Sequence, residues 1–284
     1  MPELPEVEVL VRHLDPLLRG RTINRVIVRR AKSLRGVTPA GFKRVLSGAR
    51  FGPLSRRGKY LLFELQRPGK LQPTVLIGHL GMTGRMFLSP REAQLPKHFV
   101  VAIELGRQKF VFEDPRYFGG FTLNPKPVAA LGPEPLSDQF TPRNLGAGLE
   151  RSRQAIKVKL LDQSLVAGIG NIYACEALFR ARLSPWYPSN RLRPAQVKAL
   201  WRAIRSTLGE AVRGGSTLTL NFSGTGERTG LFYFGRAPGS AESYQERLRV
   251  YGREGQPCVR CGTLIRRITQ GARSSFFCPQ CQAK

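Results

Sequence analysis

The chain has 284 residues, 41% of them hydrophobic, which is enough for two domains with a real core. It carries 46 Lys and Arg against 19 Asp and Glu, a net charge of +27, and the excess is spread over residues 1–150 (24 basic, 12 acidic) and 151–284 (22 basic, 7 acidic). This balance favours a polyanionic partner, nucleic acid first. No apolar run approaches the ~20 residues that a membrane-spanning helix needs.

Residues 4–19 predict the first helix. Apolar side chains recur there at helical spacing, with Pro5 in the first turn and Gly20 as a stop signal: Leu4, Val7, Leu10, Val11, Leu14, Leu17 and Leu18. Residues 22–125 then alternate as short strands separated by turn residues, among them TINRVIVRR, KYLLFEL, PTVLIGHL, HFVVAIEL and QKFVFED. This pattern predicts a β-sandwich with the N-terminal helix packed on it.

The second half of the chain changes character. A Pro-rich stretch without periodicity at 124–138 indicates a linker, and helical spacing dominates residues 142–213. We therefore expect an α+β protein with four parts. These are a helix and β-sandwich domain at 1–132, a linker at 133–149, a helical domain at 150–246 that ends in a Gly-, Ser- and Thr-rich loop at about 215–246, and a terminal module at 247–284.

Four of the five cysteines lie in the terminal module. Cys258 and Cys261, then Cys278 and Cys281, form two C-x2-C pairs separated by sixteen residues, the pattern of a closed structural zinc site. The segments TLIRRIT and SSFF flank QGAR between the pairs, so we expect a β-hairpin zinc finger holding one Zn²⁺. Cys175 falls outside this pattern, and an inert buried thiol is the default for it. This cysteine usage fits a reducing cytoplasm better than a secreted disulfide framework.

The segment GIGNIYACEALF enters a helix from a glycine-rich turn. Backbone amides at such a turn can hold a phosphate, and Asn171 could donate a further hydrogen bond. Turns of this kind are also common helix entries, so the motif alone is a weak signal.

The first eight residues, MPELPEVE, concentrate unusual chemistry at the terminus. Removal of the initiator Met would expose the secondary amine of Pro2, which as an α-amino group titrates near pH 8 and is partly neutral at pH 7. Such an amine can attack a sugar carbon to form a Schiff base, and the adjacent Glu3 could act as an acid. For Glu8 we favour a simpler role as a partner of the helix dipole.

Several motifs occur in order along nearly the whole chain and together resemble the bacterial formamidopyrimidine-DNA glycosylases. They are MPELPEVE (1–8), RRGKYLLF (56–63), HLGMTGR (79–85), DPRYFGG (114–120), GIGNIYACEALF (168–179), LRVYGREG (248–255) and the terminal four-Cys finger. The resemblance implies a helix-two-turn-helix DNA-binding domain. It also implies a repair enzyme that removes 8-oxoguanine and formamidopyrimidines from duplex DNA and cuts the strand by β,δ-elimination.

The same resemblance implies catalytic roles, residue by residue. Pro2 matches the nucleophile that attacks C1′, Glu3 the acid that protonates the ribose ring oxygen, and Glu6 a residue that helps to hold the terminal amine. Lys59 matches a lysine assigned to proton transfer in elimination and to phosphate contact. Arg273 matches the zinc-finger arginine that grips phosphate and is credited with a role in the second elimination.

The resemblance also implies DNA contacts. Met82, Arg116 and Phe118 match three residues that fill the gap left by the extruded base, where an apolar side chain and a ring restore stacking and Arg hydrogen-bonds the orphaned partner base. His98, Arg153 and Asn171 match backbone contacts, and we add Lys157 to the expected DNA-binding residues.

Two positions depart from the family pattern. Thr219 stands where relatives often carry a cation, in a loop that normally caps the extruded base, so lesion preference is the least secure inference. Tyr117 replaces a more usual basic residue between Arg116 and Phe118.

Two alternatives stay open. One is the endonuclease-eight branch that removes oxidised pyrimidines, against which Leu4, Met82, Arg116 and Phe118 argue, and the other is a catalytically silent DNA-binding zinc protein. Our reading is an enzyme that acts as a monomer on double-stranded DNA containing oxidised bases or abasic sites. We expect it in the bacterial cytoplasm, at the nucleoid.

Overall fold

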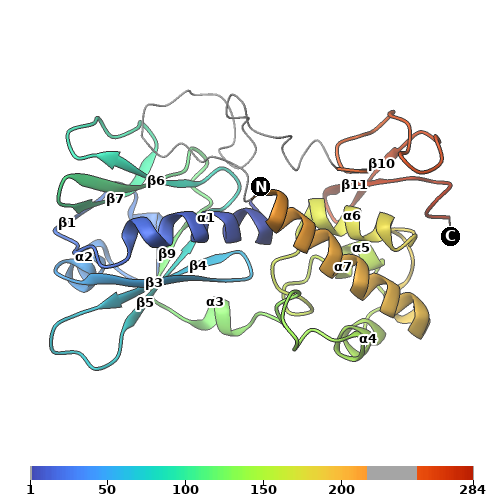
Figure 1. Ribbon diagram of the computed structural model, residues 1–284, viewed down its shortest axis with the longest axis horizontal. Coiled ribbons are helices and arrows are strands. Elements are labelled where there is room, and N and C mark those ends of the chain that lie inside the picture. The colour runs from blue at the N-terminus through green and yellow to red at the C-terminus, as the bar shows by residue number, and fades with distance from the viewer. Residues whose placement is uncertain (1, 216–247, 284) are drawn as a thin grey trace. The chain divides into compact units, whose positions relative to one another are not determined.

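The computed structural model describes residues 2–215 and 248–283 (Figure 1). Their contacts group them into two compact units. The first comprises Pro2 and Glu6–Ala129, and the second comprises Glu3–Pro5, 130–215 and 248–283. Among these residues no helix combines the length and the apolarity needed to cross a membrane. The loop predicted at about 215–246, with Thr219, lies almost wholly outside the described residues.

Helix α1 spans Leu4–Leu18, as the apolar spacing predicted. The predicted apolar stripe is buried, with Val7, Leu10 and Leu14 each at most 1% exposed, except at Leu17, which is 39% exposed. Glu8 pairs on its polar side with Arg12 at 2.8 Å and with Arg56 at 2.9 Å. The structure therefore gives Glu8 two cationic side chains as partners, beyond the dipole role expected for it.

The first unit is a β-sandwich (Figure 1). One sheet has the order β2-β9-β5-β4-β3, with bounds Leu34–Arg35, Gly120–Thr122, Thr74–His79, Tyr60–Gln66 and Arg50–Arg57. The other has the order β1-β7-β8-β6, with bounds Arg25–Val28, Phe99–Leu105, Gln108–Glu113 and Arg85–Pro90. Neighbouring strands are antiparallel except β2 and β9, which run parallel.

Aromatic side chains join the two sheets. The ring of Phe63 in β4 lies 5.7 Å from that of Phe110 in β8, and Phe112 lies 5.4 Å from Phe121 in β9. These residues belong to one buried cluster that also contains Val7, Leu10, Val11, Leu14 and Leu18 of α1. The burial of these inward-facing side chains is what the strand alternation predicted.

Some elements of this unit escaped the sequence prediction. Helix α2 (Pro39–Leu46) begins after Thr38, whose hydroxyl accepts from the Gly41 amide at 3.1 Å, a cap-and-proline signal that was present in the sequence. Strand β3 was missed because Gly52 and Pro53 interrupt its apolar pattern, where its pairing with β4 shifts register. Two short elements, η1 (Ala31–Ser33) and α3 (Lys126–Ala129), complete the unit.

The second unit is helical. It contains α4 (Pro142–Glu150), α5 (Ile156–Lys159), α6 (Asn171–Arg180), η2 (Ser189–Arg191) and α7 (Pro194–Gly215), followed by the hairpin β10 (Arg266–Gln270) and β11 (Arg273–Phe277). The hairpin strands pair antiparallel from Arg266 with Phe277 to Gln270 with Arg273, as expected around QGAR. The residues 133–149 expected as a linker include α4, whose N-cap Thr141 accepts from the Asn144 amide at 3.1 Å.

One buried carboxylate ties the C-terminal segment to α6. Glu176 is 4% exposed and accepts from the backbone amides of Arg249, Val250 and Tyr251 at 3.0, 2.9 and 2.9 Å. Burial raises the pKa of Glu176, and these three amide donors oppose that rise. The segment that leads into the finger is therefore anchored on the helix that begins with Asn171.

Candidate active site and nucleic-acid interface

Glu3 is the most constrained of the predicted catalytic residues. Its side chain is 0% exposed, and Oε1 accepts from the Ile172 amide at 3.0 Å while Oε2 faces the Tyr173 amide at 3.4 Å. The next residue, Leu4, donates its own amide to the Gly168 carbonyl at 3.1 Å. The first amides of α6 therefore orient the Glu3 side chain at the N-terminus of this helix.

The turn before α6 is shaped to receive this side chain. A Cβ on Gly170 would stand 2.2 Å from the Glu3 carboxyl carbon, so only glycine leaves the space. Gln163 braces the turn by donating to the Ile169 carbonyl at 2.9 Å and accepting from the Gly168 amide at 3.0 Å. Two amides of the helix that follows this turn, those of Ile172 and Tyr173, already face Glu3, so phosphate binding by the turn stays a prediction.

Other predicted residues gather in the same unit. Asn171 is 9% exposed and donates Nδ2 to the Ser274 carbonyl at 2.8 Å, so it holds the strand that carries the exposed Arg273. The charges of Arg273 and Glu3 both act on Lys157. Arg153 is exposed on the segment before α5.

Lys157 is wholly buried. It is 0% exposed, and within the described part of the chain its Nζ has no hydrogen-bond partner. Desolvation is the main reason why the pKa of Lys157 lies below its usual value. A phosphate contact would require this side chain to leave its buried position, so its DNA contact stays a prediction.

The remaining catalytic candidates lie in the first unit. Pro2 is buried, Glu6 is 5% exposed in the first turn of α1, and Lys59 occupies the two-residue turn between β3 and β4. Their assigned chemistry stays a prediction.

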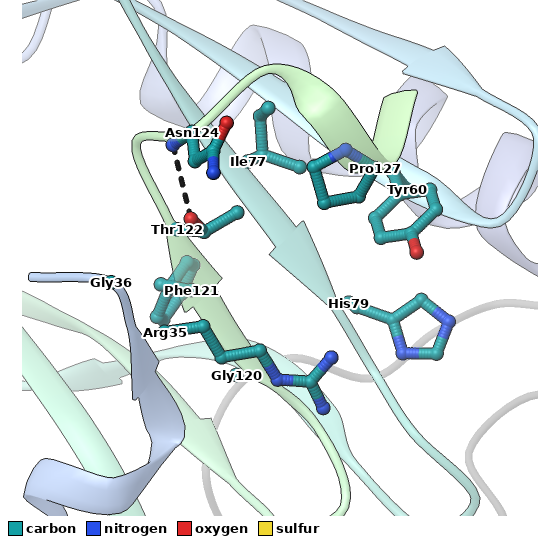
Figure 2. Close-up of a pocket in the computed structure, with 10 residues that line it drawn as sticks. All are labelled: Arg35, Gly36, Tyr60, Ile77, His79, Gly120, Phe121, Thr122, Asn124 and Pro127. Atoms are coloured by element: carbon teal, nitrogen blue, oxygen red, sulfur yellow. Dashed lines mark hydrogen bonds between the residues drawn. The ribbon is translucent and has the colours of Figure 1, made fainter. Parts of the chain in front are cut away.

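A pocket of about 160 Å³ opens on the five-stranded sheet of this unit (Figure 2). Figure 2 shows the Arg35 guanidinium and the His79 imidazole at one end, with Tyr60, Asn124 and Pro127 also lining the pocket. Desolvation, with the nearby Arg35 and Lys59 charges, lowers the pKa of His79 to about 4. The imidazole is therefore neutral at pH 7 and, because Nδ1 accepts from the Gly81 amide at 3.0 Å, carries its proton on Nε2.

Sequence reasoning assigned His79 no role. The residue stands at the start of HLGMTGR, a motif that was used only for resemblance. The available signal was a histidine at the end of an apolar strand, followed two residues later by glycine. The sequence does not specify the packing that buries the ring, the nearby charges of Arg35 and Lys59, or the hydrogen bond from the Gly81 amide that fixes the tautomer.

The three predicted void-filling residues are exposed and grouped on two turns of the first unit. Met82 is 38% exposed and Phe118 is 48% exposed, so both large apolar side chains are accessible to a partner. The guanidinium carbon of Arg116, also exposed, lies 4.7 Å from the centroid of the Phe118 ring. An apolar wedge beside a stacked guanidinium suits insertion into DNA.

The departure at Tyr117 has a structural role. Its hydroxyl lies 3.1 Å from Nδ1 of His98, and the guanidinium carbon of Arg30 lies 3.9 Å from its ring centroid. Tyr117 adopts φ +55°, a left-handed conformation that costs a bulky residue of order 1–3 kcal/mol. These contacts fix the Tyr117 side chain and orient the ring of His98.

The four cysteines of the finger converge as their spacing predicted. The Sγ atoms of Cys258, Cys261, Cys278 and Cys281 lie within 4.8 Å of one another, with individual separations of 4.0, 3.5 and 3.4 Å. A tetrahedral zinc with Zn–S bonds of about 2.3 Å places its sulfurs about 3.8 Å apart, so the set fits Zn²⁺. The amides of Arg260 and Cys281 point at Cys258 and Cys278 sulfurs over 3.4 Å, which stabilises thiolates.

Cys175 lies outside this set. It is 2% exposed, and burial raises the pKa of its thiol to about 12. A thiol with this pKa is unreactive at neutral pH, in agreement with the inert role expected for it.

Comparison with known proteins places these features in context. The chain matches three family models in succession: the formamidopyrimidine-DNA glycosylase N-terminal domain over residues 1–121, the formamidopyrimidine-DNA glycosylase H2TH domain over 131–222, and the zinc finger found in FPG and IleRS over 255–284. It is 43% identical to the formamidopyrimidine-DNA glycosylase of Paracoccus denitrificans, covering 99% of this chain and 100% of the relative. The enzyme of Symbiobacterium thermophilum is 41% identical, with coverage of 99% and 89%.

Several solved structures of Fpg (MutM) proteins are similar to this chain. A complex of Lactococcus lactis Fpg with DNA containing N7-benzyl-Fapy-dG has a TM-score of 0.86 and 31% identity, covering 100% of both chains. The MutM (Fpg) protein of Thermus thermophilus has a TM-score of 0.82 and 37% identity, covering 100% of this chain and 99% of that one. A further MutM structure contains carbocyclic 8-oxo-G DNA, with a TM-score of 0.85 and 31% identity over all of both chains.

Proposed function

This chain belongs to the formamidopyrimidine-DNA glycosylase family, and from that premise we propose that it removes oxidised purines from duplex DNA and then cleaves the strand at the resulting abasic site. Its relatives are bound in solved structures to DNA that contains Fapy-dG, an 8-oxo-G analogue or an abasic site. The net charge of +27 suits a phosphate backbone. The enzyme would act as a monomer at the bacterial nucleoid.

The proposed nucleophile is the secondary amine of Pro2 after loss of Met1. Its nitrogen forms a bond to C1′ of the damaged nucleotide while the bond from C1′ to the base breaks, and the proton that the amine loses in forming this bond leaves with the base. Glu3 protonates the ribose ring oxygen, the sugar opens, and an iminium joins Pro2 to C1′. Loss of the 3′ and then the 5′ phosphate by β,δ-elimination follows, and water releases the enzyme.

One observation carries this proposal. Glu3, next to Pro2 in the chain, is buried, and its carboxylate is oriented by the Ile172 amide at 3.0 Å. A terminal residue is ordinarily frayed. A carboxylate fixed in this way beside a candidate amine is preorganised for proton transfer.

Other residues would grip the substrate. Lys59 would contact phosphate and assist proton transfer in elimination, and Arg273 would grip phosphate from β11 and support the second elimination. Glu6 would help to hold the terminal amine, while His98, Arg153, Asn171 and Lys157 would contact the DNA backbone. Met82, Arg116 and Phe118 would fill the space left by the extruded base.

The zinc ion is structural in this scheme. Cys258, Cys261, Cys278 and Cys281 would hold it, and all four positions are occupied by protein sulfur, which leaves no coordination site for substrate. By holding the ion, the four cysteines would fix the base of the hairpin that carries Arg273. The covalent chemistry belongs to the protein's own amine.

Borohydride trapping tests the nucleophile. Incubation of Met1-processed protein with an 8-oxoguanine duplex and hydride should yield a covalent protein–DNA adduct, and the mass of its N-terminal peptide should place the link at Pro2. The Pro2→Gly variant, which keeps a primary terminal amine, should trap far more slowly. Absence of any adduct would support a catalytically silent DNA-binding protein instead.

A lesion panel tests the substrate class. Duplexes with 8-oxoguanine, a formamidopyrimidine or dihydrothymine should be cleaved with preference for the purine lesions. A preference for dihydrothymine would favour the endonuclease-eight alternative, for which the exposed Met82, Arg116 and Phe118 give no support.

A further inference from the structure

Asp114 joins the two turns that carry the void-filling residues. It is 0% exposed and stands directly after β8, at the start of the segment that contains Arg116 and Phe118. Its Oδ1 accepts from the Thr83 hydroxyl at 2.6 Å, and Thr83 follows Met82. The Asp114 carboxylate thus connects Thr83, the neighbour of Met82, to the turn that carries Phe118.

Asp114 also shapes its own turn. Oδ1 accepts from the Arg116 amide at 3.2 Å, Oδ2 accepts from the Gly119 amide at 2.8 Å, and its carbonyl accepts from the Tyr117 amide at 3.2 Å. These bonds enclose Arg116, Tyr117 and Phe118 from both sides. Hydrogen bonds to a charged acceptor are the stronger kind, so this buried carboxylate rigidifies the turn.

The two turns are in close backbone contact. A Cβ on Gly81 would lie 2.5 Å from the Gly119 nitrogen and 2.8 Å from the Phe118 carbonyl carbon. Arg35 adds a further bond by donating to the Phe118 carbonyl at 2.7 Å. The turns therefore form one packed body, and Asp114 and Thr83 provide the side-chain link inside it.

We propose that Asp114, through Thr83, is a positioning residue that holds Met82 at a fixed separation from Arg116 and Phe118, so that all three enter the space left by an extruded base together. This inference rests on the proposed void-filling function. Restored stacking compensates the free-energy cost of unpairing only if Met82, Phe118 and the Arg116 guanidinium enter the duplex at the same time and in the correct relative positions.

Thr83→Val tests the hydrogen bond between Thr83 and Asp114, because valine has nearly the same side-chain shape as threonine. It removes the hydroxyl but leaves the Asp114 bonds to the Arg116 and Gly119 amides in place. Single-turnover excision of 8-oxoguanine from a duplex should fall roughly tenfold, the effect of losing one hydrogen bond to a carboxylate. Cleavage of the same duplex with a preformed abasic site, which has no base to extrude, should change less than about twofold.

Thr83→Ser is the matched control. It restores the hydroxyl and should return excision to within about twofold of the original protein. A 2-aminopurine beside the lesion gives a second readout, because its fluorescence rises when stacking is broken; the rise should be smaller for Thr83→Val and normal for Thr83→Ser. Melting temperatures of both variants check that the fold is intact.

Asp114→Asn provides a second variant. The amide replaces one acceptor oxygen by a donor, so the Arg116 or the Gly119 amide loses its partner, and the excision defect should exceed that of Thr83→Val. If Asp114→Asn does not fold, the comparison of Thr83→Val with Thr83→Ser still tests the proposal. Equal loss on lesion and abasic substrates, no loss on either, or a failure of Thr83→Ser to restore excision would overturn it.

Met82→Ala and Phe118→Ala separate this inference from the function on which it rests. If both variants excise 8-oxoguanine at the original rate, the void-filling function itself is wrong. If they are defective while Thr83→Val is normal, only the role of Asp114 and Thr83 is wrong.

Discussion

Glu3 accepts a hydrogen bond from the backbone amide of Ile172, a residue 169 positions further along the chain, at 3.0 Å. The contact places a carboxylate from the extreme N-terminus on the first turn of α6. It explains how a terminal segment can be fixed firmly enough to present an amine, because a frayed end would spend little time in a reactive geometry.

Glu3→Gln should separate base excision from strand cleavage at an abasic site. The amide keeps the size of the side chain and one acceptor oxygen but cannot supply a proton as a carboxylic acid does. We expect base excision to fall at least about 100-fold, within the usual range for loss of a general acid, while cleavage of a preformed abasic site persists. Glu8→Gln in α1, which loses pairs with Arg12 and Arg56, is the control and should excise normally. Equal loss of both activities in Glu3→Gln would remove its assigned role.

Gly170→Ala should reproduce much of the excision defect of Glu3→Gln, although it replaces no catalytic residue. The added methyl would displace the Glu3 carboxylate, whose carbon would otherwise lie 2.2 Å away. Gly146→Ala in the same unit is the control, because its methyl would meet Val197 only at 3.6 Å. Normal excision by Gly170→Ala would show that the position of the Glu3 side chain on α6 is unimportant.

Zinc removal should unfold the finger and weaken DNA binding together. Cys258→Ser removes one of the four converging sulfurs, and a structural zinc contributes directly to folding free energy. We expect less than one zinc per chain by metal analysis, and DNA affinity lower by at least tenfold with a shallower salt dependence, because the position of Arg273 is lost. Cys175→Ala, outside the set, should keep its zinc. Unchanged affinity in zinc-free protein would refute the coupling.

His79 should make the protein less stable in mild acid. Its pKa is about 4 in the folded state, against about 6.5 when unfolded. Between these values the unfolded chain binds a proton that the folded protein refuses, so the free energy of unfolding falls as pH drops from 6.5 to 4 and does not depend on this group above pH 7. Denaturant titrations should show that His79→Gln loses less stability over this window, by about 1–3 kcal/mol. Parallel pH curves for the two proteins would contradict the shift.

The buried position of Lys157 should lower the free energy of unfolding. Its buried ammonium has no hydrogen-bond acceptor among the described residues, and burial lowers its pKa. Lys157→Met, of similar volume, should therefore leave the free energy of unfolding at pH 7 unchanged or raise it by about 1 kcal/mol or more. Lys159→Met is the matched control and should lower it by about 0.5 kcal/mol, because Lys159 pairs with Asp162 at 2.8 Å. A drop of about one in the salt slope of DNA binding for Lys157→Met would establish the predicted phosphate contact instead.

The sequence by itself determined the features whose signals lie in neighbouring residues. The apolar stripe of α1 repeats with the helical period, and strands such as Tyr60–Gln66 alternate, so local side-chain patterns were sufficient. The C-x2-C pairs identified the zinc site because each pair must place two sulfurs on one ion. The order of the motifs then indicated the family.

Only the tertiary structure decided the contacts between distant segments. Nothing in MPELPEVE states that Glu3 meets Ile172, nor does DPRYFGG show that Asp114 accepts from Thr83. His79 likewise acquires its lowered pKa from burial and, to a lesser extent, from the charges of Arg35 and Lys59, which lie on other elements. These interactions depend on backbone placement to within a few tenths of an ångström, set by the packing of whole units, whereas periodicity and spacing record only what each segment buries along its own length.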